Sequence, residues 1–197
     1  MNIPGPADVF WLESEEHFDM LSDSTRLEMI ELLMRPHSVG EVAEQMRVPR
    51  TRLYHHVNQL EQAGMIRVVD TRQAGAQTEK IYQATAYSYQ PSDRYLEEAM
   101  PREKAQAVLT AIFGATEADF IRSVEEGAVT FDDRATRRRL HLRRGLLQLD
   151  DERLEEFIAD LEAVYAKYDT DHLEAAPDDA QLVATVSLVY PSTRSIR

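Results

Sequence analysis

Apolar residues recur at helical spacing in the first third of the chain, and the pattern predicts two short helices before residue 47. The first helix follows the polar capping residues Ser22–Thr25 and ends near Pro36. The second starts at Ser38, whose hydroxyl is spaced to form a capping box with Glu41. The positions expected to be buried on these helices are Leu27, Ile30, Leu33, Met34, Val39, Val42, Ala43 and Met46.

A third helix is predicted to begin at about Arg50, directly after Pro49, because proline is tolerated in the first turn of a helix. Its apolar residues, Leu53, Val57 and Leu60, fall on one face. Gly64 is placed to end it. Since only a Val48-Pro49 turn separates the second and third helices, the three elements predict a helix-turn-helix arrangement.

Two short β-like runs follow Gly64 and predict a hairpin. They cover Met65–Asp70 and Glu79–Ala84, and the loop between them is expected at Arg72–Thr78. A further strand is expected at Asp8–Leu12, and a brief helix at Phe18–Leu21. Residues 1–90 are therefore predicted to form a winged helix-turn-helix domain.

The pattern changes after Pro91, where residues 91–197 are predicted to form a dimerisation or regulatory region. A long amphipathic helix is expected over Arg102–Glu126, and its apolar stripe favours a dimer seam over an effector pocket. The stripe residues expected to mediate dimerisation are Val108, Leu109, Ile112, Phe113 and Phe120. A small α/β subdomain is predicted by a helix capped by Asp150, a strand over Leu182–Tyr190 and an earlier strand, interrupted at Gly145, that is indicated by Leu140, Leu142, Leu146, Leu147 and Leu149. The fold class is therefore α+β.

Charge changes the picture through its distribution. The chain of 197 residues has a formal net charge of −13, which by itself argues against binding to nucleic acid. Residues 1–20 contribute −5, residues 21–90 contribute 0 and residues 91–197 contribute −8. Residues 47–80 nevertheless carry a local charge of +3, so a basic region lies between two acidic flanks.

Several blocks between residues 21 and 66 resemble the ArsR-type winged helix-turn-helix transcriptional regulators of bacteria and archaea. The blocks are Leu21–Leu33, Ser38–Met46, Leu53–Val57 and Leu60–Ile66, in the order and spacing of that family, and they cover about a third of the chain. The resemblance implies a homodimer that binds double-stranded DNA through a recognition helix at Arg50–Asn58. It also implies that His56 half-packs against the core.

The residues expected to contact DNA lie on the third helix and the hairpin. On the helix, arginines suit phosphates or guanine edges, and the polar and aromatic side chains suit phosphates, thymine methyls or base edges. On the hairpin, basic and amide side chains suit phosphate or minor-groove contacts. The predicted residues are Arg50, Thr51, Arg52, Tyr54, His55, Asn58, Arg72, Gln77 and Lys80.

Other classes of site have little support in the sequence. There is no cysteine, no nucleotide-binding glycine pattern and no histidine pair with ligand spacing, so neither catalysis nor a cofactor or metal site is predicted. The metal-sensing members of the resembled family place cysteines where this chain has Val42–Glu44, or histidines on a helix that here, at Arg102–Glu126, has none. No signal peptide or membrane span is expected, which predicts a cytoplasmic protein.

Three interpretations follow. The first is a homodimeric transcriptional regulator, a repressor, that binds a pseudo-palindromic operator. The second is a winged-helix module that binds proteins without contacting DNA, which the net charge favours. The third is a regulator gated by a small molecule held in a cavity of the C-terminal half.

Overall fold

The computed structural model describes residues 5–74, 77–92, 94–95, 101–129, 131, 140–168 and 183–193. The chain divides into two compact units, Met1–Glu125 and Glu126–Arg197. The boundary falls after the long helix rather than at residue 90, because this helix packs on the N-terminal helices.

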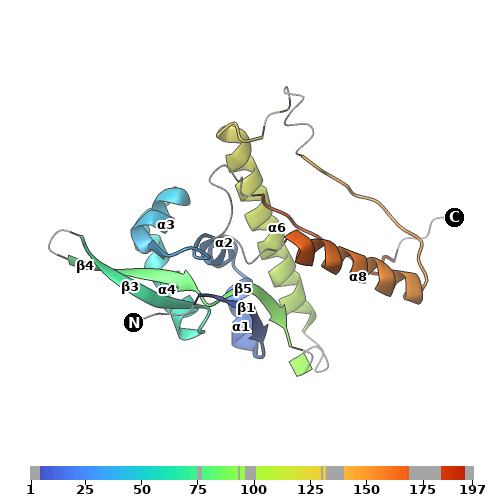
Figure 1. Cartoon of the computed structure of the whole chain (residues 1–197), viewed down its shortest axis with the longest axis horizontal. Coiled ribbons are helices and arrows are strands. Elements are labelled where there is room, and N and C mark those ends of the chain that lie inside the picture. The colour runs from blue at the N-terminus through green and yellow to red at the C-terminus, as the bar shows by residue number, and fades with distance from the viewer. Residues whose placement is uncertain are drawn as a thin grey trace. The chain divides into compact units, whose positions relative to one another are not determined.

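The first unit contains four short helices (Figure 1). Polar side chains cap the first turns of three of them. Ser14, Asp23 and Ser38 accept hydrogen bonds from backbone N–H groups in the first turns of α1, α2 and α3. The capping box predicted for Ser38 and Glu41 is present. The helices are α1 (Glu15–Leu21), α2 (Ser24–Leu32), α3 (Val39–Gln45) and α4 (Arg50–Gln62).

Two residues with positive φ shape the connections around α4. Arg47 lies in the turn between α3 and α4 with φ of 55°, which is uncommon for a residue with a side chain. Gly64 ends α4 with φ of 73°, and the Met65 N–H donates back to the Leu60 carbonyl at 3.0 Å. The prediction that Gly64 ends the third helix is confirmed.

The wing is a three-stranded antiparallel sheet in the order β2-β4-β3. Its strands are β2 (His37–Ser38), β3 (Ile66–Ala74) and β4 (Gln77–Ala84), and a bulge at Val68/Asp70 interrupts the β3–β4 ladder. The strands run further than the pattern predicted, because polar residues continue the ladder as far as Ala74 and Gln77. The loop predicted at residues 72–78 is therefore wrong over most of its length, and Arg72 lies within β3.

A second sheet pairs two distant segments in parallel. β1 (Ala7–Leu12) confirms the strand predicted at the N-terminus, and β5 (Ala86–Pro91) is its partner. Phe10 of β1 packs against the rings of His17 and Tyr89. The sheet therefore ties the start of the chain to the segment that leaves the wing.

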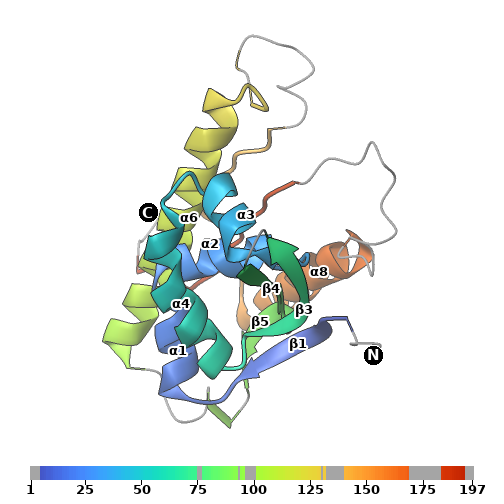
Figure 2. The same cartoon turned by 90° about the vertical axis from the view of Figure 1, so that its left-hand side faces the viewer.

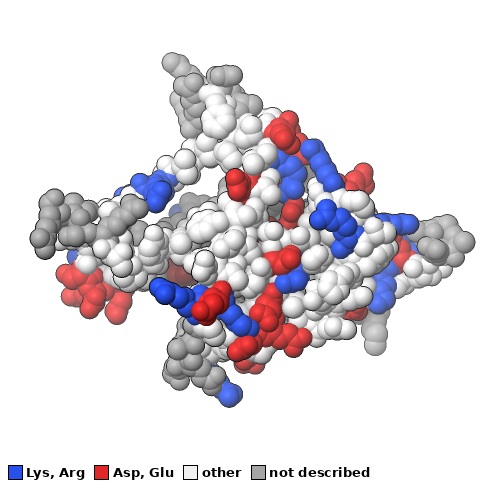
Figure 3. Space-filling view, turned by 180° about the vertical axis from the view of Figure 1, so that it is seen from behind, with Lys and Arg blue, Asp and Glu red and all other residues white. Residues whose placement is uncertain are grey.

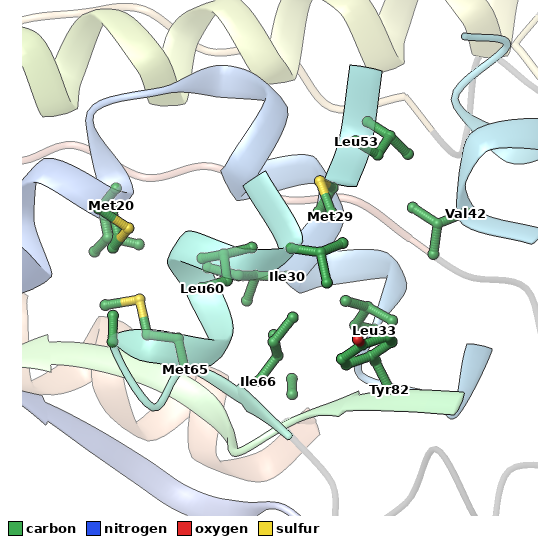
Figure 4. Packing of buried hydrophobic residues seen from close by; sticks show 14 of the residues in the cluster. Met20, Met29, Ile30, Leu33, Val42, Leu53, Leu60, Met65, Ile66 and Tyr82 are labelled. Atoms are coloured by element: carbon green, nitrogen blue, oxygen red, sulfur yellow. The ribbon is translucent and has the colours of Figure 1, made fainter. Parts of the chain in front are cut away.

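The core lies between the helices and the inner face of the wing (Figure 4). Met29 of α2 and Leu33 at its C-cap, Leu53 and Leu60 of α4, and Ile66 of β3 are almost fully buried in it. These side chains point toward one another in Figure 4, and α2, α3 and α4 lie on one side of the hairpin in Figure 2. Most of the positions predicted to be buried on the first three helices are in this cluster.

The long helix α6 (Arg102–Glu125) packs against α1 and α2 through small side chains, including the buried Ala111 and Ala115. Ion pairs hold both of its ends. Lys104 lies 2.9 Å from Asp19, and Arg122 pairs with Glu28 on α2. The predicted helix is therefore present, and one face of it belongs to the core of its own unit.

In the second unit, α8 (Asp151–Tyr168) confirms the helix predicted after Asp150, whose carboxylate accepts the Arg153 N–H at 2.9 Å. The strands predicted on either side of it are not formed in the part of these segments that the structure describes. The described residues at 140–150 and 183–193 have no regular secondary structure. An alternating pattern becomes a strand only with a hydrogen-bonded partner, and within the described residues these segments have none.

Candidate nucleic-acid interface

Helix α4 has two faces of opposite character. Leu53, Val57 and Leu60 are buried in the core. The opposite face is exposed, and its tyrosine, Tyr54, remains 48% accessible. The predicted recognition residues on the exposed side are Arg50, Thr51, Arg52, Tyr54, His55 and Asn58.

Gln62 joins this exposed face, although it was not among the predicted contacts. It lies four residues after Asn58 and seven after His55, so all three fall on the same side of the helix. The spacing of these residues in the sequence is therefore enough to place Gln62 on the exposed face. By contrast Gln59, only three residues before Gln62, is turned inward and accepts a hydrogen bond from Arg26 at 3.2 Å.

Arg26 of α2 contacts two neighbouring helices through its guanidinium group. Its guanidinium donates to the carbonyls of Asp19 and Met20, near the end of α1, and to the Gln59 side chain of α4. One arginine therefore links α1, α2 and α4. It holds α4 against the two preceding helices, and it is not an available cation.

His56 lies on the inner edge of α4, as the resemblance implied. Its Nδ1 is 3.9 Å from the carboxylate of Asp23, the N-cap of α2. Burial lowers the pKa of His56 from its ordinary value, and the nearby Asp23 only partly offsets this. The imidazole therefore packs in its neutral form and is set apart from exposed His55.

The wing arginine predicted to contact phosphate is held by carboxylates. Arg72 Nη1 donates to Glu41 Oε1 at 2.9 Å, and its Nε donates to Glu79 Oε2 at 3.1 Å. Its Nη2 also donates to Ser38 Oγ at 3.3 Å. These hydrogen bonds raise the pKa of Arg72 from its ordinary value, with Glu41 contributing most.

Lys80 and Gln77, the other wing residues predicted to bind DNA, have different positions. Lys80 Nζ lies 3.7 Å from a Glu61 oxygen and 5.7 Å from the centre of the Tyr82 ring, and Tyr82 and Glu61 raise its pKa. The backbone of Gln77 pairs with Ala74, but its side chain lies outside the described part of the structure.

Four of the six bases in residues 47–80 are thus engaged within the protein. Besides Arg72 and Lys80, Arg47 lies 3.9 Å from Glu125, and Arg67 donates to the Gly5 carbonyl at 2.9 Å. Within the described ranges, no carboxylate lies at ion-pair distance from the two arginines of α4. Figure 3 shows basic and acidic side chains interspersed on the face in view.

The first turn of α4 contains both of these arginines. Pro49 occupies the N-cap position, and no side chain there accepts a hydrogen bond from the helix. The free N–H groups of a first turn and its positive dipole end both suit an anion. The two arginines and the helix end therefore both suit an anionic group beside the exposed polar face.

Comparison with known families supports this interpretation. The family described as a helix-turn-helix domain matches residues 21–69. This chain contains a helix-turn-helix domain. The match extends from the end of α1 into β3 and includes the whole of α4. No curated protein matches the sequence.

The match supports a helix-turn-helix regulator that binds DNA, while the ArsR subtype stays a prediction. No group of histidine and carboxylate side chains that could hold a metal occurs in the described ranges. None of the described helices is long and apolar enough to cross a membrane.

The predicted dimerisation residues of α6 fall into two groups. Val108 packs against the core of its own unit, and Ile112 is half-buried. Leu109, Phe113 and Phe120 remain exposed, at 38%, 49% and 39% of their surface. The intervals of four and seven residues between them place all three on one stripe.

Proposed function

We propose that this protein is a sequence-specific transcriptional regulator that binds double-stranded DNA through α4. The observation that carries the proposal is the division of α4 into a buried apolar face and an exposed face with uncommitted arginines, inside a helix-turn-helix domain. A helix with these two faces can rest on its own domain while its polar side chains enter the major groove.

The roles of the side chains follow from their chemistry. Arg50 and Arg52 contact phosphates or guanine edges, because guanidinium groups pair with both. Thr51 and Asn58 contact base edges, and Asn is suited to pair with adenine. Tyr54 and His55 contribute contacts to phosphates or to the methyl groups of thymine.

The protein acts as a homodimer on a pseudo-palindromic operator. Two helix-turn-helix units of a dimer read half-sites about 34 Å apart, one turn of DNA. The exposed stripe of Leu109, Phe113 and Phe120 supplies an apolar surface that a second copy covers. A dimer bound across a promoter would exclude polymerase, so the proposed direction of regulation is repression.

The test begins with selection of binding sequences from a random duplex library, followed by affinity measurements on the selected sequence. Arg52→Ala is expected to weaken binding at least tenfold. Arg153→Ala removes the same charge from an exposed position on α8 and serves as the matched control. Equal affinities of the two variants, or failure to select any sequence, would contradict the proposal.

A protein-interaction module is the second candidate function. The net charge of −13 and the neutralised bases of the wing favour it, because they leave few cations for phosphates. It predicts no DNA binding even at low salt. Gating by a small molecule in the C-terminal half remains a prediction. The proposed repression is tested with a promoter reporter.

A further inference from the structure

Four side chains meet where the outer part of the wing leaves the helix-turn-helix domain, and they are called the wing clamp below. They are Ser38 at the start of α3, Glu41 in its first turn, Arg72 on β3 and Glu79 on β4. Arg72 donates to the other three at distances between 2.9 and 3.3 Å. The wing clamp therefore joins both strands of the hairpin to the first helix of the helix-turn-helix.

The wing clamp lies beyond the point where the sheet has three strands. β2 pairs only with Tyr82 and Ile81 of β4, whereas the Arg72–Glu79 pair is further out along the hairpin. There the hairpin has only two strands, and an isolated two-stranded hairpin is marginal in stability. The orientation of the outer wing therefore depends on side chains, and among them Arg72 contacts Glu41 of α3.

The charges favour a clamp over a phosphate contact. Arg72 carries one positive charge and lies between two carboxylates, so the cluster is negative overall. If Arg72 moved to a phosphate, Glu41 and Glu79 would lose their cation beside the DNA. The planar guanidinium can reach both carboxylates and the Ser38 hydroxyl at once, a geometry that a lysine ammonium does not reproduce.

The cluster is also sterically confined. A methyl group added at Gly40 would lie 3.3 Å from Glu79 Oε1 and 3.6 Å from Ser38 Oγ. The Ser38 hydroxyl is buried, and the Ser38 N–H donates to Glu41 Oε2 at 2.7 Å. The capping box of α3 thus holds Glu41 in the position from which it receives Arg72.

We propose that Arg72 is a positioning residue that fixes the outer wing against α3 in the orientation needed for DNA binding, and that it does not itself contact phosphate. The inference rests on the proposed DNA-binding function. The wing clamp then couples the wing to the helix-turn-helix, so that the two reach the duplex as one rigid surface.

The deciding variants are Glu79→Gln and Arg72→Lys, measured on the selected operator. Glu79→Gln removes a negative charge, so a phosphate-contacting Arg72 predicts equal or tighter binding. Loss of the wing clamp predicts binding about fivefold weaker. Glu44→Gln, at an exposed acid on α3 outside the wing clamp, is the matched control and should change affinity by less than twofold.

Arg72→Lys keeps the positive charge but removes the planar guanidinium that reaches all three partners at once. The proposal predicts an affinity close to that of Arg72→Ala, and an Arg72→Ala/Glu79→Gln double variant no weaker than Arg72→Ala alone. The salt dependence of Arg72→Ala should equal that of the wild type. Tight binding by Arg72→Lys or Glu79→Gln, or a reduced salt slope for Arg72→Ala, would overturn the proposal.

Amide hydrogen exchange separates failure of the wing clamp from failure of the proposed function. In the free protein, Arg72→Ala and Glu79→Gln should speed exchange at residues 70–73 and 78–80, while α2 and α4 keep their protection. Unchanged exchange in the wing would overturn the wing clamp even if the protein binds DNA. Faster exchange in a protein that binds no DNA would refute the DNA-binding function alone.

Discussion

The salt dependence of DNA binding can be worked out from the free cations of the helix-turn-helix unit. Sequence alone offers six bases in residues 47–80, but four of them are engaged within the protein. Arg50 and Arg52 remain, so a dimer presents four arginines. With a slope of about −0.9 per neutralised phosphate, log K should fall with log salt at a slope of about −3.6.

The measurement is fluorescence anisotropy with a labelled operator between 50 and 200 mM KCl. Affinity should fall about 150-fold over this range at a slope of −3.6, whereas twelve arginine and lysine contacts would give a slope near −11. Arg52→Ala should bring the slope to about −1.8 because a dimer loses two contacts. A wild-type slope of −8 or steeper would refute the assignment of the wing cations to intramolecular partners.

Four further predictions concern the fold and the dimer. Leu53→Ala should lower the free energy of unfolding by about 3 kcal/mol in urea titrations, because it leaves a cavity under α4; no loss would contradict its burial. Arg47→Gly should raise stability by about 0.5 to 1 kcal/mol, because glycine relieves the positive φ and the exposed pair with Glu125 contributes little; a lower melting temperature would count against this. The Ser38 N–H holds the pKa of Glu41 below its ordinary value, so its contribution to stability is present above about pH 4.3 and is lost as the pH falls further. Urea midpoints at pH 6 and pH 3 should therefore differ less in Glu41→Gln than in the wild type, and an equal difference would contradict this assignment. Phe113→Glu should convert the dimer to a monomer in sedimentation, with Ala118→Glu as the control on another face of α6; a dimeric Phe113→Glu protein would exclude this seam.

The parts of the fold that could be predicted from sequence are local. The capping box of Ser38 and Glu41 needs residues three apart, and the buried face of α4 needs only the spacing of Leu53, Val57 and Leu60. Such signals are complete within one helix. The helix-turn-helix and the buried face of α4 were therefore predicted from the pattern.

The parts that escaped prediction depend on distant partners. β5 is a strand because β1, nearly eighty residues away, pairs with it. Arg72 looked like a free cation in a loop, and its partner Glu41 lies thirty-one residues before it. The two strands expected beside α8 show the converse, because alternation alone does not supply a hydrogen-bonding partner.

The packing of α6 limits the spacing of the operator half-sites that a dimer can bind. Ala111 and Ala115 pack one side of this helix on its own domain, and ion pairs at Lys104 and Arg122 hold its ends. The stripe of Leu109, Phe113 and Phe120 is exposed. In a dimer joined through that stripe, the helix that forms the seam packs directly on α1 and α2, and α2 in turn contacts α4. The distance between the two α4 helices of such a dimer is then fixed. One inserted base pair at the operator centre displaces one half-site by about 3.4 Å and rotates it by about 34°. A dimer of fixed geometry cannot adjust to this change.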